Sequence, residues 1–156
     1  MVSKEDIEYK KTYTGIFSLN YFFQGFTSSM FTVIIPIYLL SVITQEGGNI
    51  TASDISFLAA IILLPSAIKL LFGMLSDKLG LKKIGRRRPW IVFPVLIAGS
   101  MWILLPFAVA AGNVLLIFTI IGFIINTGVM MADTAMDGLI LDICPKARLG
   151  RVQGLV

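Results

Sequence analysis

Two very long stretches without a charged residue dominate this sequence. Thr12–Gln45 covers about 34 residues and Ile91–Ala132 about 42 residues, and neither contains Asp, Glu, Lys or Arg. A helix that crosses a bilayer needs about 20 mainly apolar residues. The first stretch is therefore long enough for one tilted or projecting span, and the second is long enough for two spans.

The overall composition agrees with a membrane protein whose first partner is the lipid bilayer. The chain is 56% hydrophobic and 14% charged, whereas soluble domains carry about 25% charged residues. The net charge of +4 does not indicate a nucleic-acid surface, because the 13 basic residues fall in or beside three short patches separated by charge-free spans. This distribution is typical of membrane topology signals. We expect no nucleic acid as a partner.

The charge pattern predicts an all-α membrane protein with four transmembrane helices. The expected helices are residues 12–43, 54–76, 89–110 and 114–143, with the start of a fifth near 147–156. Thr51 or Ser53 is expected to cap the second helix. The segment Gly73–Trp90 contains six Lys or Arg residues, so it is placed in the cytoplasm. The N-terminus is then cytoplasmic as well, and we expect a multi-pass protein of the plasma membrane.

The fourth expected span carries a polar stripe. Asn126, Met130, Asp133 and Asp137 follow an i, i+4, i+7, i+11 spacing, which places them on one helical face. Carboxylates inside a membrane are costly unless they face the bundle interior, a water-filled cavity or a cation. Lys69 and Asp137 both lie about 10 Å from the cytoplasmic ends of their spans, so they can pair. A structural ion pair and a role in substrate or proton coupling both remain open.

The first expected span has a polar face of its own. Asn20, Gln24 and Ser28 recur every four residues and share one side of the helix. They either contact a polar substrate or make hydrogen bonds between helices. The neighbouring aromatic cluster Tyr21–Phe23 is more typical of lipid-facing bulk.

Asp77 lies at the C-terminal end of the second span, where its charge opposes the helix dipole. It therefore needs a donor. Either Lys78, Lys82 or Arg86 solvates it, or it binds another helix end and releases during a conformational change.

The sequence gives no sign of an enzyme. It has no histidine and one cysteine, so it offers no metal cluster of those residues and no internal disulfide. No nucleophilic or phosphate-cradling motif is found, and we expect neither cofactor nor metal.

The basic segment resembles the cytoplasmic loop between helices 2 and 3 of the major facilitator superfamily. The matching residues are Gly73, Asp77, Lys78, Gly80 and the basic run that ends with Arg86, Arg87 and Arg88. Leu81 stands where the family usually has a basic residue, and Ile84-Gly85 lengthens the loop. Residues 21–25, 64–69, 85–90 and 133–138 are similar to the muropeptide permease and acetyl-CoA transporter branch. Folate–biopterin and glycoside–cation symporters share parts of this likeness.

The resemblance implies the first part of a twelve-helix fold built from two six-helix halves of inverted repeats. It implies a secondary active transporter, in this branch a symporter, that moves a small polar solute by alternating access. The expected coupling cation is H⁺ or Na⁺. In the family the loop acid contacts the opposite half and stabilises the outward-open state. We therefore expect an incomplete N-terminal portion that needs a C-terminal half or a partner chain.

These expectations give a set of candidate residues. The substrate or coupling candidates are Asn20, Gln24, Asn126, Asp133, Asp137 and Lys69, and residues 73–88 form the gating loop. Three other readings stay open. They are a non-transporting four-helix scaffold, a half-transporter completed by another chain, and a dimeric four-helix drug exporter. Such exporters place an acid in the first helix, and this chain has none there.

Overall fold

The computed structural model describes residues 9–45, 50–80, 85–110 and 113–154, and within them the chain is helical without a β-strand. Four helical stretches are long and apolar enough to cross a membrane, namely Thr12–Thr44, Ala52–Lys78, Arg88–Ala108 and Val114–Ile143. The expected all-α fold with four spans is confirmed.

The first span changes its helical winding midway. Helix α1 (Lys11–Ser29) passes into a π-helical turn η1 (Met30–Ile34) and then into α2 (Ile35–Gln45). The N–H of Ile35 donates to the carbonyl of Met30, five residues earlier. Pro36 follows directly and has no N–H to offer the preceding turn, so the wider winding lies beside the place where a regular helical bond is missing.

The second span is interrupted at Ile68, between α3 (Ala52–Ala67) and α4 (Lys69–Lys78). Ile68 has φ −102° and ψ 10°, outside the helical region, and Pro65 lies one turn before it. At the other end of α3, Thr51 is the cap. Its hydroxyl accepts the N–H of Asp54, and its own N–H donates to the Asp54 carboxylate at 2.8 Å.

The third and fourth spans are less broken. Helix α5 (Arg88–Leu104) continues into the 3₁₀ turn η2 (Leu105–Ala110). Helix α6 (Val114–Ile143) starts with the Asn113 side chain accepting the N–H of Leu116 at 3.2 Å, and it runs unbroken for 30 residues. The short α7 (Lys146–Gln153) follows after Pro145, which lies at its N-cap.

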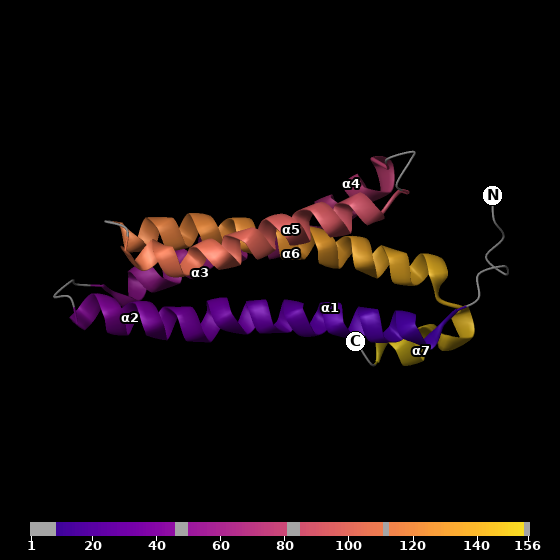
Figure 1. Cartoon of the computed structure of the whole chain (residues 1–156), viewed down its shortest axis with the longest axis horizontal. Helices are drawn as coiled ribbons and strands as arrows, with labels where there is room; N and C mark the ends of the chain where they lie inside the picture. Colours follow the sequence, from indigo (N-terminus) through magenta and orange to yellow (C-terminus); the bar gives the residue numbers. More distant parts are fainter. Residues whose placement is uncertain (1–8, 46–49, 81–84, 111–112, 155–156) are drawn as a thin grey trace.

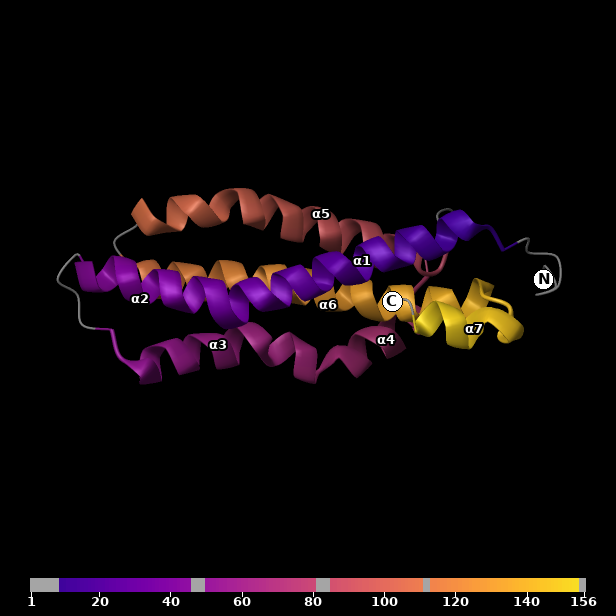
Figure 2. The same cartoon turned by 90° about the horizontal axis from the view of Figure 1, so that it is seen from below.

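Helix α6 is the centre of the arrangement. It contacts α1, α3, α4 and α5, and Figures 1 and 2 together show α5 and α3 on either side of it with α1 along a third side. Helix α7 turns back along the bundle (Figure 1), and its Val152 belongs to one apolar cluster with Phe17 of α1 and Ile140 of α6. The end of the bundle that carries Lys78, Arg86, Arg87 and Arg88 is called the basic end below.

Small residues let the neighbours approach α6 closely. A Cβ on Gly128 would lie 2.5 Å from the carbonyl oxygen of Pro94, and one on Gly122 would lie 2.6 Å from Cδ1 of Ile62. Phe31 and Ile125 are buried in the core around these contacts. In a bilayer, such close packing is a main source of helix association.

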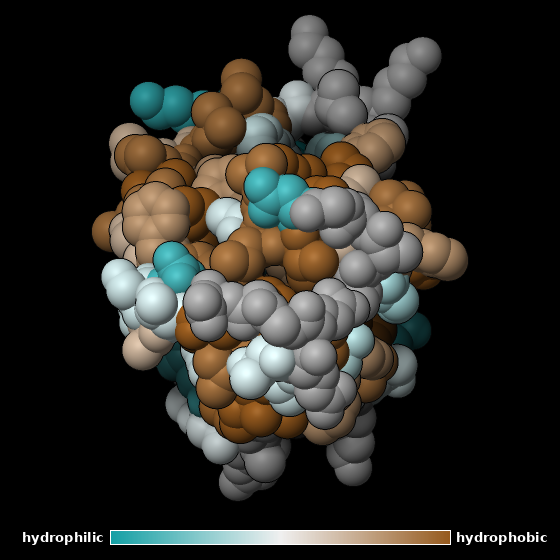
Figure 3. All heavy atoms as spheres, turned by 90° about the vertical axis from the view of Figure 1, so that its left-hand side faces the viewer, coloured by the Kyte–Doolittle hydropathy of each residue, from teal (hydrophilic) through white to brown (hydrophobic). Residues whose placement is uncertain are grey.

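Large apolar side chains cover the outside of the bundle. Leu70 is 76% exposed and Ile103 is 71% exposed. Figure 3 looks at one end of the bundle and shows brown apolar side chains around its outer edge. An apolar exterior with polar groups inside is what a lipid solvent selects. The protein is therefore an integral, multi-pass membrane protein.

The contact between Gly128 and Pro94 gives a stability prediction. Gly128→Ala should lower the free energy of unfolding by about 1–3 kcal/mol relative to Gly99→Ala, because its methyl group would force α5 away from α6. Gly99 is the matched control, since a Cβ there meets nothing within 4 Å and both changes gain the same helix propensity of about 1 kcal/mol. Unfolding in mixed micelles measures both variants, and equal stabilities would contradict the packing described.

Candidate functional site

A polar cavity of about 440 Å³ lies between four helical segments in the middle of the bundle. Helix α1 contributes Tyr21, Gln24, Gly25 and Ser28, α3 contributes Ser66, α4 contributes Lys69, and α6 contributes Asn126 and Met130. Hydroxyl, amide and ammonium groups thus lie together at a level of the bundle where the lipid-facing side chains are apolar. We call it the central cavity.

Lys69 and Asp133 form an ion pair at this cavity. The Lys69 Nζ and Asp133 Oδ2 atoms are 3.6 Å apart, and the two side chains are 43% and 2% exposed. Gln24 of α1 interacts with the same carboxylate. Among the residues that the structure describes, no hydrogen-bond partner reaches Asp133 Oδ1, although that atom is buried. The carboxylate is therefore desolvated and only partly compensated.

The break in the second span puts Lys69 at the start of α4. Thr134 of α6 donates its hydroxyl hydrogen to the Met130 carbonyl at 2.7 Å and lies 3.4 Å from the Lys69 carbonyl. Helices α4 and α6 lie very close together here, as a Cβ on Gly73 would be only 2.8 Å from the Thr134 methyl group. Discontinuous helices often line binding sites in transporters.

Asn126 bonds chiefly to the neighbouring helix. Its Nδ2 donates to the Ile62 carbonyl at 2.7 Å and to the Ser66 Oγ at 3.2 Å. Ile62 lies three residues before Pro65, where the proline weakens the regular helical bonds. Asn126 therefore holds α3 against α6 while it also lines the central cavity.

Asp137 has a partner that the sequence analysis did not select. The hydroxyl of Tyr21 donates to Asp137 Oδ1, so the ion pair of Lys69 is with Asp133 and not with Asp137. Tyr21, Gln24 and Ser28 follow an i, i+3, i+7 spacing, and this signal was available in the sequence. Phe22 and Phe23 are 64% and 57% exposed, as expected for lipid-facing rings.

A second cavity of about 200 Å³ separates α1 from α5 and α6. Asn20, Gln24 and Thr27 line it from α1, opposite Trp102 of α5. Gln24 belongs to both cavities, whereas Asn20 lines only the smaller one. The two amides predicted to act together therefore share the smaller cavity, and only Gln24 also lines the central cavity.

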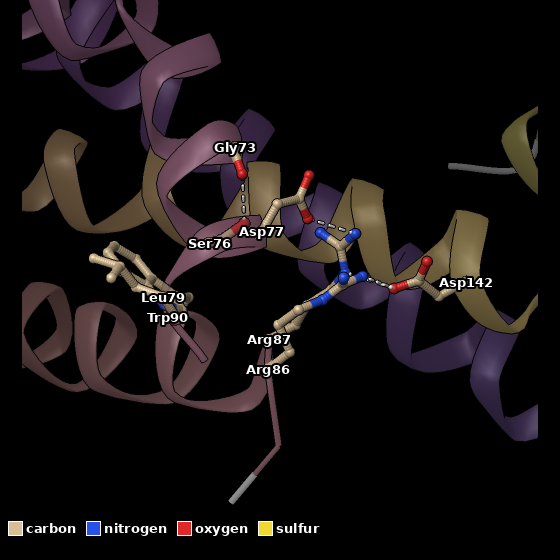
Figure 4. Close-up of polar contacts among 8 residues, drawn as sticks. All are labelled: Gly73, Ser76, Asp77, Leu79, Arg86, Arg87, Trp90 and Asp142. Atoms are coloured by element: carbon tan, nitrogen blue, oxygen red, sulfur yellow. Dashed lines mark hydrogen bonds and ion pairs between the residues drawn. The ribbon is translucent and has the colours of Figure 1, made fainter. Parts of the chain in front are cut away.

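A network of charged side chains ties three helices together at the basic end. Arg87 Nη2 is 2.8 Å from Asp77 Oδ1 on α4, and Arg87 Nε donates to Asp142 Oδ2 on α6 at 2.7 Å. Arg86 also reaches Asp142 Oδ2, at 3.1 Å. Figure 4 shows the Arg87 guanidinium between the two carboxylates. We call Asp77, Arg86, Arg87 and Asp142 the charge network.

The charge network supplies the donor that Asp77 needs, and the donor is Arg87. Lys78, Lys82 or Arg86 was one of two expected alternatives, and Lys82 lies outside the described residues. The other alternative was a contact with another helix end, and Arg87 lies at the start of α5. Asp142 was not selected from the sequence, although a carboxylate in the last turn of the fourth span opposes the helix dipole as Asp77 does. Gly138 makes room for the network, because a Cβ there would overlap the Arg87 guanidinium.

The remaining loop residues pack around this network. A Cβ on Gly80 would lie 3.0 Å from the Arg86 Cα, and the Trp90 indole N–H donates to the Leu79 carbonyl at 2.6 Å. Lys78 and Arg88 are exposed. Within the described part of the chain, no group of three or more His, Cys, Asp or Glu residues could hold a metal ion.

Comparison with known proteins gives a family. The family model described as the Major Facilitator Superfamily matches residues 17–156, and the match includes both cavities and the charge network. No curated protein and no solved structure matches the chain.

Arg87 should be sensitive to a change that keeps its charge. Arg87→Lys should lower the free energy of unfolding by about 1–3 kcal/mol, because one ammonium group cannot reproduce the fork that reaches both Asp77 and Asp142. Arg88→Lys is the matched control at an exposed position. Thermal unfolding in detergent compares the two, and a loss of the same size in both variants would argue against the bridging role.

Proposed function

Because the chain belongs to the Major Facilitator Superfamily, whose members are transporters, we propose that it moves a small polar solute across the membrane by alternating access. The observation that carries this proposal is the pairing of buried Asp133 with half-exposed Lys69 at the central cavity. Charged groups at membrane depth are expensive, and they commonly mark substrate or ion pathways.

The lining of the central cavity suits a polar solute. Tyr21, Ser28 and Ser66 offer hydroxyl groups, and Gln24 and Asn126 offer amides. Each of these groups is costly to bury without a partner in a lipid solvent. A solute with several polar groups can make further hydrogen bonds to these side chains, whereas an apolar solute can make none. Asn20, Gln24 and Thr27 are polar groups of the smaller cavity, whose lining is otherwise mainly apolar.

The charge network is our candidate for the gate. Arg87 connects α4, α6 and the start of α5 through two carboxylates, so its ion pairs must break if these helix ends separate. Opening one end of the bundle is the kind of transition that breaks and remakes such pairs. We propose that the residues Gly73–Arg88 act as the gating loop and that the Asp77 pair opens and closes during transport.

The orientation and location belong to the same proposal. The excess of Lys and Arg at the basic end favours the cytoplasmic side for that end, and with it for the N-terminus. We place the protein in the plasma membrane. The likeness to muropeptide permeases and acetyl-CoA transporters, and with it a symport mechanism driven by H⁺ or Na⁺, stays a prediction from the motifs.

A transport assay distinguishes this function from a membrane scaffold. The natural polypeptide that carries this sequence would be placed in proteoliposomes and offered labelled small polar solutes under an inward proton or sodium gradient. A scaffold would accumulate none of them.

In this assay, Asp133→Asn and Asp137→Asn should each abolish accumulation driven by the gradient, because the neutral amide cannot take up and release a cation. Asp54→Asn is the matched control, since Asp54 is an exposed carboxylate at the far end of α3. Unchanged accumulation in both test variants would remove the coupling role of the two carboxylates.

A further inference from the structure

We infer that the solute is a small organic anion that binds together with one proton. The Lys69–Asp133 ion pair couples the two binding events, because Asp133 takes the proton while Lys69 pairs with the anion. This inference rests on the proposed transport function and names its substrate class. It follows from the unequal burial of the pair, the charge of the cavity lining and the unpaired oxygen of Asp133.

Lys69 brings a positive charge to a cavity whose other lining groups are neutral. Of the described residues that line the central cavity, it is the only charged one, and its side chain is 43% exposed. The hydroxyl groups of Ser28 and Ser66 and the amide of Gln24 can donate hydrogen bonds to a carboxylate or a phosphate. The donors of Tyr21 and Asn126 are already engaged with the protein. The side chain that faces the solute is therefore a cation surrounded by neutral donors.

Asp133 lies behind Lys69 and depends on it. Its side chain is 2% exposed, and the 3.6 Å separation from Lys69 Nζ is longer than the 2.7–2.9 Å typical of a charge-assisted hydrogen bond. Its Oδ1 has no hydrogen-bond partner among the described residues. A buried carboxylate that loses its cation binds a proton, since the neutral acid costs far less to bury.

The other groups around Asp133 favour the same exchange. Asp137 lies one turn away on α6, and its negative charge makes a second carboxylate ion less favourable. Tyr21 of α1 donates to Asp137, and Gln24 of α1 interacts with Asp133 as a neutral amide. Helix α3 carries charge only at Asp54 and α5 only at Arg88, both near the helix starts, so neither replaces Lys69.

The exchange balances in charge and in atoms. A proton from the aqueous side forms an O–H bond on the Asp133 carboxylate, and the ion pair with Lys69 breaks. The ammonium group keeps its three protons and pairs with the entering anion. The site gains one proton and one negative charge, so its net charge does not change. Neither ligand binds well alone, which is the thermodynamic requirement for symport.

This linkage predicts how anion affinity depends on pH. Above the titration range of Asp133, each anion takes up one proton, so the affinity should fall about tenfold for each unit of rising pH. Asp133→Asn imitates the protonated acid and leaves Lys69 without its partner. Its anion affinity should therefore be independent of pH. Lys69→Gln should lose anion binding at every pH.

The experiment uses the natural polypeptide in nanodiscs. The probes are acetate, succinate and glycerol 3-phosphate, each compared with acetamide, succinamide or glycerol as its uncharged counterpart. Thermal stabilisation between about pH 5.5 and about pH 7.5 reports binding. Carboxylates and phosphates are separate arms, and the arm that stabilises the protein identifies the anion. Lys10→Gln and Asp54→Asn, both at exposed positions, are the matched controls and should keep the pH dependence.

Infrared difference spectra of the unmodified protein provide a readout that does not depend on the folding of a variant. Anion binding should produce the carbonyl band of a protonated carboxyl group. Binding of anions without this band, or with no pH dependence, would overturn the inference.

Transport assays with the same probes separate the two levels of the proposal. If only uncharged probes bind and are transported, the solute is not an anion, but the transport function stands. If no probe binds and no solute is transported, the proposed function fails together with the inference.

Discussion

Close packing against α6 is the constraint on which the rest of the structure depends. In lipid, apolar side chains gain little by leaving the solvent, so helices associate through fit and through polar contacts. Gly122 and Gly128 bring the second and third spans against α6 at distances that a larger residue would prevent. This approach brings Asn126 within reach of the Ile62 carbonyl and Asp133 within reach of Lys69.

The polar groups inside the bundle occupy two levels with different chemistry. At the central cavity a single ion pair lies among neutral groups, and its carboxylate is almost fully buried. At the basic end Arg87 joins two carboxylates that are 53% and 41% exposed. Water reaches these two carboxylates when their contacts with Arg87 break, which suits a gate. The buried pair has no such substitute, which suits a site that exchanges one ligand for another.

Sequence reasoning found the membrane spans, most of the polar face of α6 and the pairing of Lys69 with that face. It named Asp137 as a possible partner of Lys69 by counting residues from the cytoplasmic ends of the two spans. Depth alone does not choose between two carboxylates one turn apart on the same helix face, and in the structure Lys69 pairs with Asp133. For Asp77 the sequence left two alternatives open, a nearby Lys78, Lys82 or Arg86 or another helix end, and its partner is Arg87 at the start of α5. Tyr21 was grouped with the lipid-facing rings beside it.

The sequence by itself determined that this is a membrane protein with four spans and one strongly basic connection. Charge-free length and the positions of Lys and Arg are properties of the chain alone, and the loop motif pointed to the family that the comparison found. Only the tertiary structure decided which polar groups meet. Successive residues on a helix are rotated by about 100°, so one π turn or one interrupted turn changes the face that a side chain occupies. The partners of Lys69, Asp77 and Tyr21 depend on which face each helix turns toward its neighbours and on how closely each helix approaches α6.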